Sequence, residues 1–200
     1  MTILAHIASI GISIVVAVSV GIGASAYVLR DTPSKDTYQQ TSVARVAFAA
    51  PPTRLIIPML EIEATIETVG RTQGGAMESP SNFRDVAWYK GGARPGEEGS
   101  AVIAGHLDNA FGLSGVFKDL DTLTIGSYVY VQTASGEEMQ FRVIRVAEYR
   151  YDEVPTRELF ERDGGMYLNL ITCSGVWLQE HKTYDHRFIV YTEHVPDGEG

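Results

Sequence analysis

Eight short segments rich in β-branched and aromatic residues follow one another along this chain, and they constrain its fold more than any other feature. They are Arg54–Pro58, Ala64–Val69, Val86–Tyr89, Ser100–His106, Ser127–Gln132, Glu138–Glu148, Tyr167–Thr172 and Arg187–Glu193. Turn residues such as Pro95-Gly96 separate them, and short helices are expected at Ser114–Leu120 and Thr156–Arg162. Because closing a sheet on itself removes exposed strand edges, the pattern predicts a mainly β fold: an eight-stranded barrel, closed or nearly closed, with short helices.

The segment Glu138–Glu148 contains a change of phase. Met139, Phe141 and Val143 alternate with polar residues, as a strand with one buried face requires, but the next apolar positions are Ile144 and Val146. A slip of one residue in the alternation is typical of a β-bulge or of a bend at a barrel corner. We therefore expect an irregularity in this strand.

An uncharged, apolar stretch runs from Thr2 to Leu29. About 20 apolar residues span a bilayer core as a helix, so residues 1–29 are predicted to form a transmembrane anchor. A cleaved signal peptide is the alternative, since Ala24-Ser25-Ala26 resembles a cleavage site. Signal peptides, however, have a shorter apolar core of roughly 7–15 residues behind a basic start, and residues 1–6 contain no Lys or Arg.

The rest of the chain divides by composition. Residues 30–52 are polar, lack periodicity and end in Pro51-Pro52, so they are predicted to be a tether. A single barrel domain is expected at 53–194, with a tail at 195–200.

The net charge of −9 argues against nucleic acid or an anionic lipid surface as a partner, because phosphate binding needs clustered Lys and Arg.

Cys173 is the one cysteine of the chain, and it closes the apolar run Tyr167–Cys173. Taken alone, a cysteine in an apolar strand is more often a small packed residue than a reactive group. The predicted anchor makes a reactive role for Cys173 more plausible, because it places the barrel outside the cytoplasm, where cysteines usually form disulfides. An unpaired cysteine there suggests a reactive thiol or an intermolecular bridge.

Connectivity groups this thiol with two other side chains. Cys173 ends one predicted strand and Arg187 begins the next, so an antiparallel pairing would bring both to the same end of the sheet. The connection 174–186 is predicted to be a long loop, and long loops are often functional. His106 also ends its strand, and it would face the same opening if that strand runs parallel to the cysteine strand. A thiol, an imidazole and a guanidinium together suit acyl transfer.

These residues carry a resemblance to the sortases, which are membrane-anchored cysteine transpeptidases of Gram-positive bacteria. Asn169-Leu170-Ile171-Thr172-Cys173 resembles the Thr-Leu-x-Thr-Cys motif, with Asn at its first position. Gly99–His106 is similar to the histidine strand of the family, and Asp185–Tyr191 to its arginine strand. Gly105-His106-Leu107-Asp108 looks most like class F. Shorter similarities are Leu55–Pro58, Trp88-Tyr89, Pro95-Gly96 and Phe117–Leu120, so the resemblance covers residues 54–193.

The resemblance implies a sortase-type barrel and a two-step transfer. Cys173 would attack the Thr–Gly carbonyl of an LPXTG-type sorting signal, and an amine from a peptidoglycan precursor would resolve the thioester. His106 would protonate the leaving amine and later deprotonate the incoming one. Arg187 would hold the substrate and stabilise the oxyanion. The implied location is the cell membrane, with a single span and the catalytic domain outside.

Other residues are weaker candidates. The family places Thr172 in substrate contact, although it could equally satisfy the sheet edge. Asp108 could orient His106 or cap a turn, and Trp177 could form a substrate wall or simply pack. The acidic pairs Glu97-Glu98 and Asp152-Glu153 do not have the spacing of a calcium loop, so no metal and no cofactor are expected.

Two other functions remain open from the sequence. One is a cysteine peptidase that releases its product to water, which would use the same three groups. The other is a cell-wall binding module without chemistry, in which Cys173 would be inert and buried.

Overall fold

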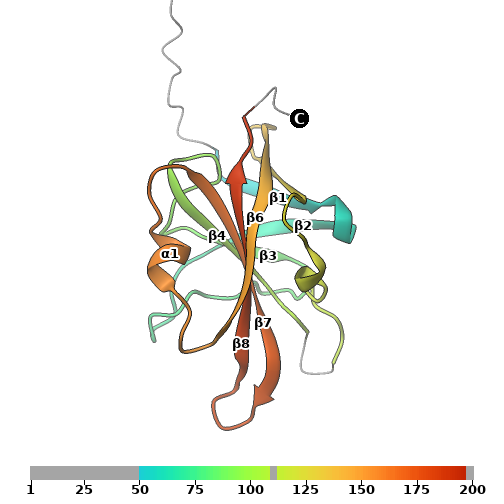
Figure 1. Ribbon diagram of the computed structural model, residues 1–200, viewed down its shortest axis with the longest axis vertical. Coiled ribbons are helices and arrows are strands. Elements are labelled where there is room, and N and C mark those ends of the chain that lie inside the picture. The colour runs from blue at the N-terminus through green and yellow to red at the C-terminus, as the bar shows by residue number, and fades with distance from the viewer. Residues whose placement is uncertain (1–49, 109–111, 197–200) are drawn as a thin grey trace, which may run out of the picture. The chain divides into compact units, whose positions relative to one another are not determined.

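The computed structural model describes residues 50–108 and 112–196, in which eight strands close into a barrel (Figure 1). In chain order the elements are β1 (Pro52–Ile57), η1 (Pro58–Leu60), β2 (Ile62–Val69), β3 (Val86–Tyr89), β4 (Gly99–Gly105), η2 (Leu120–Thr122), β5 (Tyr128–Thr133), β6 (Glu138–Arg150), α1 (Thr156–Phe160), β7 (Met166–Leu178) and β8 (Thr183–His194). The strand order is β1-β2-β3-β4-β7-β8-β6-β5, and β5 pairs with β1. The predicted strands and the closed barrel are confirmed.

Two of the strand pairs are parallel, namely β2 with β3 and β4 with β7. The other neighbours pair antiparallel. A parallel pair needs a long crossover connection, which here is formed by residues 70–85 and by residues 106–165. In the second of these parallel pairs, β4 ends at one edge of the sheet beside Ile171, and β7 continues past that edge to Leu178.

Apolar side chains fill the barrel interior. Every second residue of a strand points inward, and those that are fully buried include Leu55, Ile57, Ile103, Val131, Phe141, Leu168, Leu170 and Val190. A second cluster lies on the outside of the sheet near α1 and is centred on Tyr89, Val102, Leu159, Ile189 and Tyr191. Burial of one such Leu, Ile or Phe side chain stabilises the fold by about 1.5–3 kcal/mol.

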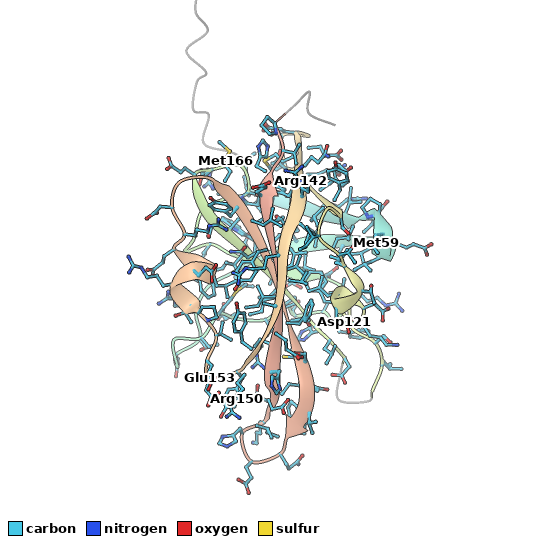
Figure 2. All side chains as sticks on the ribbon, viewed as in Figure 1. Met59, Asp121, Arg142, Arg150, Glu153 and Met166 are labelled. Atoms are coloured by element: carbon cyan, nitrogen blue, oxygen red, sulfur yellow. The ribbon has the colours of Figure 1, made fainter. Side chains whose placement is uncertain are left out.

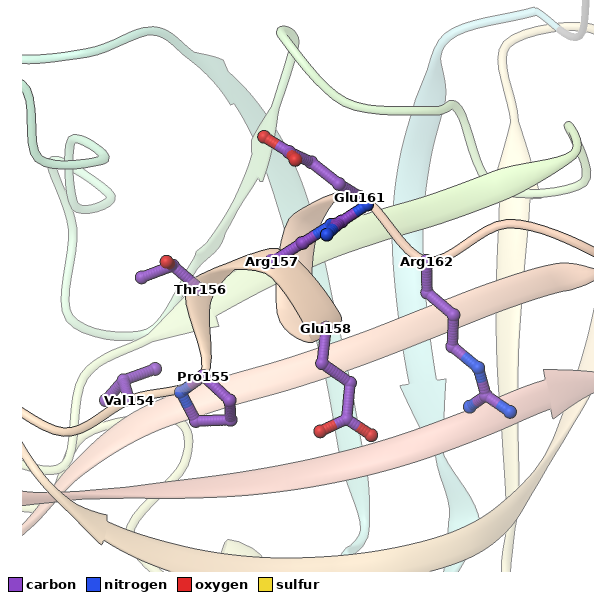
Figure 3. A pocket seen from close by; sticks show the side chains of 7 residues that line it. All are labelled: Val154, Pro155, Thr156, Arg157, Glu158, Glu161 and Arg162. Carbon is purple, nitrogen blue, oxygen red and sulfur yellow. The ribbon is translucent and has the colours of Figure 1, made fainter.

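Two side-chain interactions fix α1 against the sheet. Asn169, at the first position of the cysteine motif, points away from the interior and its Nδ2 donates to the Leu159 carbonyl at 2.7 Å. Arg145 of β6 donates to the Glu158 carboxylate; Figure 3 shows Glu158 on the helix. The predicted helix is confirmed, although it ends at Phe160 rather than at residue 162.

The predicted irregularity in β6 is also confirmed, because its register with β8 shifts between Val143 and Arg145. Val143 belongs to the interior and Ile144 to the outer cluster, whereas Val146 packs against the interior again. The extra residue at the bulge thus returns the apolar side chains to the inner face.

The predicted helix at Ser114–Leu120 is wrong. The segment forms turns that lead into η2. Its backbone instead pairs with the chain after β4, since the N–H of Gly115 donates to the Leu107 carbonyl and that of Phe117 to the His106 carbonyl, both at 2.9 Å. Gly115 permits this approach, because a Cβ there would lie 2.2 Å from the His106 oxygen.

The predicted long loop at 174–186 is wrong as well. Strand β7 continues to Leu178 and β8 begins at Thr183, so the strands form a hairpin (Figure 1). The pairing of β4 with β7 ends at Ile171, and the pairing of β6 with β8 ends at His186. Beyond these residues, β7 and β8 pair only with each other. A register shift between Ser174 and Trp177 interrupts the alternation, which is why the pattern did not predict strand here.

The predicted anchor at 1–29 and tether at 30–49 lie outside the described residues. Within 50–108 and 112–196, no helix has the length and apolar character that a bilayer crossing demands.

We expect Leu170→Ala to destabilise the barrel by about 2–5 kcal/mol, because the side chain is fully buried and its loss leaves a cavity. Urea unfolding followed by circular dichroism measures this change. The control is Ile125→Ala, whose side chain is 70% exposed and should change stability by less than about 0.5 kcal/mol. Equal costs for the two variants would contradict this assignment of the core.

Candidate active site

A cavity of about 910 Å³ lies where β4 ends and β7 continues past it into the hairpin. Its lining residues are Ser79, Ser81, Phe83, His106, Leu107, Asp108, Gly112, Cys173, Trp177, Lys182, Thr183, Tyr184 and Arg187. The structure therefore brings together Cys173, His106 and Arg187. It does so as the connectivity predicts, because β4 runs parallel to β7 and Cys173 pairs directly with Arg187 across the β7–β8 ladder.

The hairpin holds the Arg187 guanidinium rigidly. Its Nη1 donates to the Tyr184 carbonyl at 2.9 Å and to the His186 carbonyl at 2.7 Å, and its Nη2 donates to the Thr183 hydroxyl at 2.7 Å. These bonds use three of the five N–H donors of the side chain. Within the described residues, two donors remain to bind a ligand oxygen.

The Cys173 thiol is partly buried and lines the cavity. Burial raises its pKa, the Arg187 guanidinium lowers it, and the Asp108 carboxylate raises it again; the net pKa lies above the ordinary value for a thiol. The protonated thiol is thus the resting form at neutral pH, and the reactive thiolate is a minor species.

Asp108 does not orient His106 in this structure. Its carboxylate accepts a hydrogen bond from the Tyr184 hydroxyl at 2.6 Å. This bond, followed by burial and the negative charge of Asp108, raises the pKa of Tyr184 to about 12, so the phenol remains a donor at physiological pH. The contact joins the segment after β4 to the hairpin that holds Arg187.

Trp177 contacts the same tyrosine. The two rings meet edge to face with their centroids 5.3 Å apart, and Trp177 is 48% exposed at the cavity wall. The preceding residues form a bulge in which Gly175 has a φ of +81°, and the Val176 N–H donates to Asp185 Oδ1 at 2.6 Å. A Cβ at Gly175 would lie 2.1 Å from that oxygen, so the bulge requires glycine.

Thr172 does not line the cavity. It is 5% exposed, and its hydroxyl donates to the Gly105 carbonyl at 2.9 Å. It therefore joins β7 to the end of β4, one residue before Cys173 and one before His106. The sequence left two roles open for Thr172, contact with substrate or a hydrogen bond at the sheet edge. The structure shows the hydrogen bond.

Sequence reasoning missed Tyr184, Thr183 and the segment 79–83 as parts of the cavity. Thr183 and Tyr184 have high β-propensity and lie opposite Trp177 and Leu178, which is a signal for a longer hairpin. The segment 79–83 carries no comparable pattern, because it forms part of the crossover between β2 and β3.

A second, shallower hollow of about 600 Å³ lies at α1 (Figure 3). Its lining residues are Val154, Pro155, Thr156, Arg157, Glu158, Glu161 and Arg162. They include no cysteine or histidine, and Glu158 is engaged by Arg145. The groups suited to nucleophilic chemistry thus lie in the first cavity.

We expect Asp108→Asn to speed alkylation of Cys173 by iodoacetamide at pH 7. Asp108 raises the pKa of the thiol, so removing its charge increases the thiolate fraction, and a fall of one pKa unit would give about a tenfold faster reaction. Mass spectrometry of the adduct against time measures the rate. Asp121→Asn, on η2 and exposed (Figure 2), is the charge-matched control and should leave the rate unchanged. A slower reaction in Asp108→Asn would contradict this electrostatic balance.

Solved structures of known proteins have a similar fold. Sortase C-1 from Actinomyces oris is 23% identical, with a TM-score of 0.57 over 72% of this chain and 73% of that chain. Streptococcus agalactiae sortase C1, in a complex with MTSET, is 22% identical with a TM-score of 0.57 over 74% and 70%. Sortase A from Corynebacterium diphtheriae is 18% identical with a TM-score of 0.57 over 76% and 64%. At these identities the similarity concerns the fold.

No curated protein sequence shows significant similarity to the chain. The family model of the sortase domain, however, matches residues 55–195, which is well over half of this chain. The match includes the eight strands from Leu55 onward and the three residues Cys173, His106 and Arg187. The chain therefore belongs to the sortase family.

Proposed function

We propose that this protein is a cysteine transpeptidase that cleaves an LPXTG-like sorting signal between Thr and Gly and transfers the acyl group to a cell-wall amine. The observation that carries the proposal is the register of β7 with β8, which sets Cys173 opposite Arg187 in a cavity that His106 also lines. Family membership supports the same chemistry.

In the first step, Cys173 passes its thiol proton to His106, and the resulting thiolate Sγ attacks the carbonyl carbon of the Thr–Gly bond. The C–N bond breaks, a thioester forms, and His106 gives a proton to the leaving amine. In the second step an incoming amine attacks the thioester and returns a proton to His106, and the thiolate leaves.

Arg187 acts on the oxygen that becomes negative in both tetrahedral intermediates. Its guanidinium is fixed in advance by three hydrogen bonds to the hairpin, so its remaining donors need little reorganisation during the reaction. The same positive charge favours the Cys173 thiolate.

We further propose that the enzyme is of class F, on the pattern Gly105-His106-Leu107-Asp108 and the short accessory helix α1. Asp108 and Trp177 contribute to the substrate-binding wall, since both line the cavity. Thr172 would affect the reaction indirectly, because its hydrogen bond to Gly105 holds the part of β7 that carries Cys173.

Cys173→Ala should abolish the covalent adduct with a sorting peptide while leaving the barrel folded. Mass spectrometry of the full chain with a panel of LPXTG-type peptides, with and without a glycine-type amine, tests this. Amine-dependent ligation supports transpeptidation. Release of the free acid alone, even with amine present, indicates a hydrolytic peptidase, and neither adduct nor cleavage with any peptide indicates a binding module.

Arg187→Lys should reduce kcat/KM by about two to three powers of ten, the usual effect of losing one oxyanion donor. Lysine keeps the charge, but its single ammonium group cannot bond to the hairpin carbonyls and also present two directed donors to substrate. The matched control is Arg150→Lys, an exposed arginine of β6 that pairs with Asp152 (Figure 2). Activity near that of the parent in Arg187→Lys would remove the guanidinium from the mechanism.

We also propose that residues 1–29 anchor the enzyme in the cell membrane with the barrel outside. Deleting residues 1–51 should leave peptide cleavage intact, because the deletion ends before β1, but should reduce attachment of surface proteins in cells as the local concentration falls. Peptide assays and cell-wall fractionation measure the two effects. A mature protein that begins near residue 27 in the culture medium would instead indicate a signal peptide.

A further inference from the structure

The crossover between the parallel strands β2 and β3 passes beside the histidine of the site. Its residues Ser79, Ser81 and Phe83 line the cavity. Glu67, which belongs to β2, holds this crossover by its carboxylate. The Ser81 N–H donates to both carboxylate oxygens, at 3.0 and 3.1 Å, and the Ser81 hydroxyl donates to one of them at 2.9 Å.

The residue before Ser81 contacts the imidazole. Pro80 is buried, and its carbonyl oxygen lies 3.0 Å from His106 Nε2. A carbonyl oxygen can only accept a hydrogen bond, so Nε2 must carry the hydrogen. In the neutral ring the lone pair is then on Nδ1, since the hydrogen bond made by one nitrogen decides the state of the other.

We propose that Glu67 is a positioning residue for the transfer reaction: by holding Ser81 it fixes the Pro80 carbonyl, which keeps a proton on His106 Nε2 and leaves Nδ1 to exchange protons with the substrate amines. The reaction step in this inference rests on the proposed function, whereas the control of the tautomer does not.

The contacts of Glu67 distinguish it from an ordinary surface carboxylate. Glu63, four residues earlier on the same face of β2, is exposed and pairs with Arg54. Glu67 instead receives its hydrogen bonds from the crossover. The Ser81 backbone is the largest cause that lowers the pKa of Glu67, and the positive charge of His106 lowers it further, which places the carboxylate within electrostatic reach of the imidazole.

The proton balance follows from this arrangement. When the C–N bond of the substrate breaks, imidazolium Nδ1 gives its proton to the leaving amine and the neutral ring keeps the proton on Nε2. When the second amine attacks the thioester, its proton goes to Nδ1. The bond from Nε2 to Pro80 persists through both steps, so the ring does not need to rotate.

The test measures the tautomer directly. Full-length protein carrying ¹⁵N-labelled histidine is compared at alkaline pH, where imidazoles are neutral, as parent, Glu67→Ala, Glu67→Gln and the matched control Glu63→Ala. The ring-nitrogen shifts of His106 should indicate the Nε2–H form in the parent and in Glu63→Ala. In Glu67→Ala the difference between the two shifts should shrink, and Glu67→Gln, which retains one acceptor, should lie between.

A change in the ring-nitrogen shifts of His106 alone in Glu67→Ala supports the proposal. No change at His106, or an equal change at the four other histidines of the chain, would overturn it. Ser81→Ala, which removes one of the three hydrogen bonds and leaves the charge of Glu67 in place, should shift the His106 signal in the same direction by less.

Kinetics separates this inference from the proposed function. Glu67→Ala should lower kcat about three- to tenfold with little change in KM, well short of the hundredfold or more that general acid–base catalysis supplies. A change in KM alone would indicate that the crossover binds substrate instead, against the proposal. If no peptide reacts with the parent enzyme, the proposed function fails, but the NMR result still decides whether Glu67 controls the tautomer.

Discussion

The parallel pairing of β4 with β7 brings the reactive groups of the site together. Because the two strands run in the same direction, β4 ends at one edge of the barrel beside Ile171 of β7. His106 follows β4 there, and β7 continues past this edge through Cys173. The hydrogen bond from Thr172 to the Gly105 carbonyl joins them at that edge. Since β8 is antiparallel to β7, it brings Arg187 to the same place.

The charges around the thiol oppose one another. Burial and Asp108 favour the neutral thiol, whereas Arg187 favours the thiolate, and the net effect is a raised pKa. The Tyr184 hydroxyl donates a hydrogen bond to the Asp108 carboxylate and so stabilises the negative charge of that carboxylate. A thiol that rests in the protonated form reacts slowly with oxidants and alkylating agents.

Backbone irregularities, together with the regular strands, orient the side chains of the cavity. The bulge at Gly175 interrupts β7 just after Cys173 and is held by Asp185. The crossover before β3 is held by Glu67 and presents the Pro80 carbonyl to His106. In both places a carboxylate binds backbone N–H groups that no neighbouring strand satisfies, so the side chain substitutes for the missing ladder.

From the sequence alone, alternation of apolar residues predicts the eight strands and the bulge in β6, and strand connectivity predicts that Cys173 and Arg187 lie together. His106 joins them because β4 pairs in parallel with β7, a contact between segments far apart in the chain that the sequence pattern does not set. The sequence did not determine the hairpin after Cys173 or the turns after His106, where a bulge and a close backbone approach at Gly115 override the local pattern. Three hydrogen bonds depend on the fold alone: Thr172 to Gly105, Tyr184 to Asp108 and His106 to Pro80. Each of these contacts joins segments that are far apart in the chain, and their partners are set by packing and not by sequence spacing.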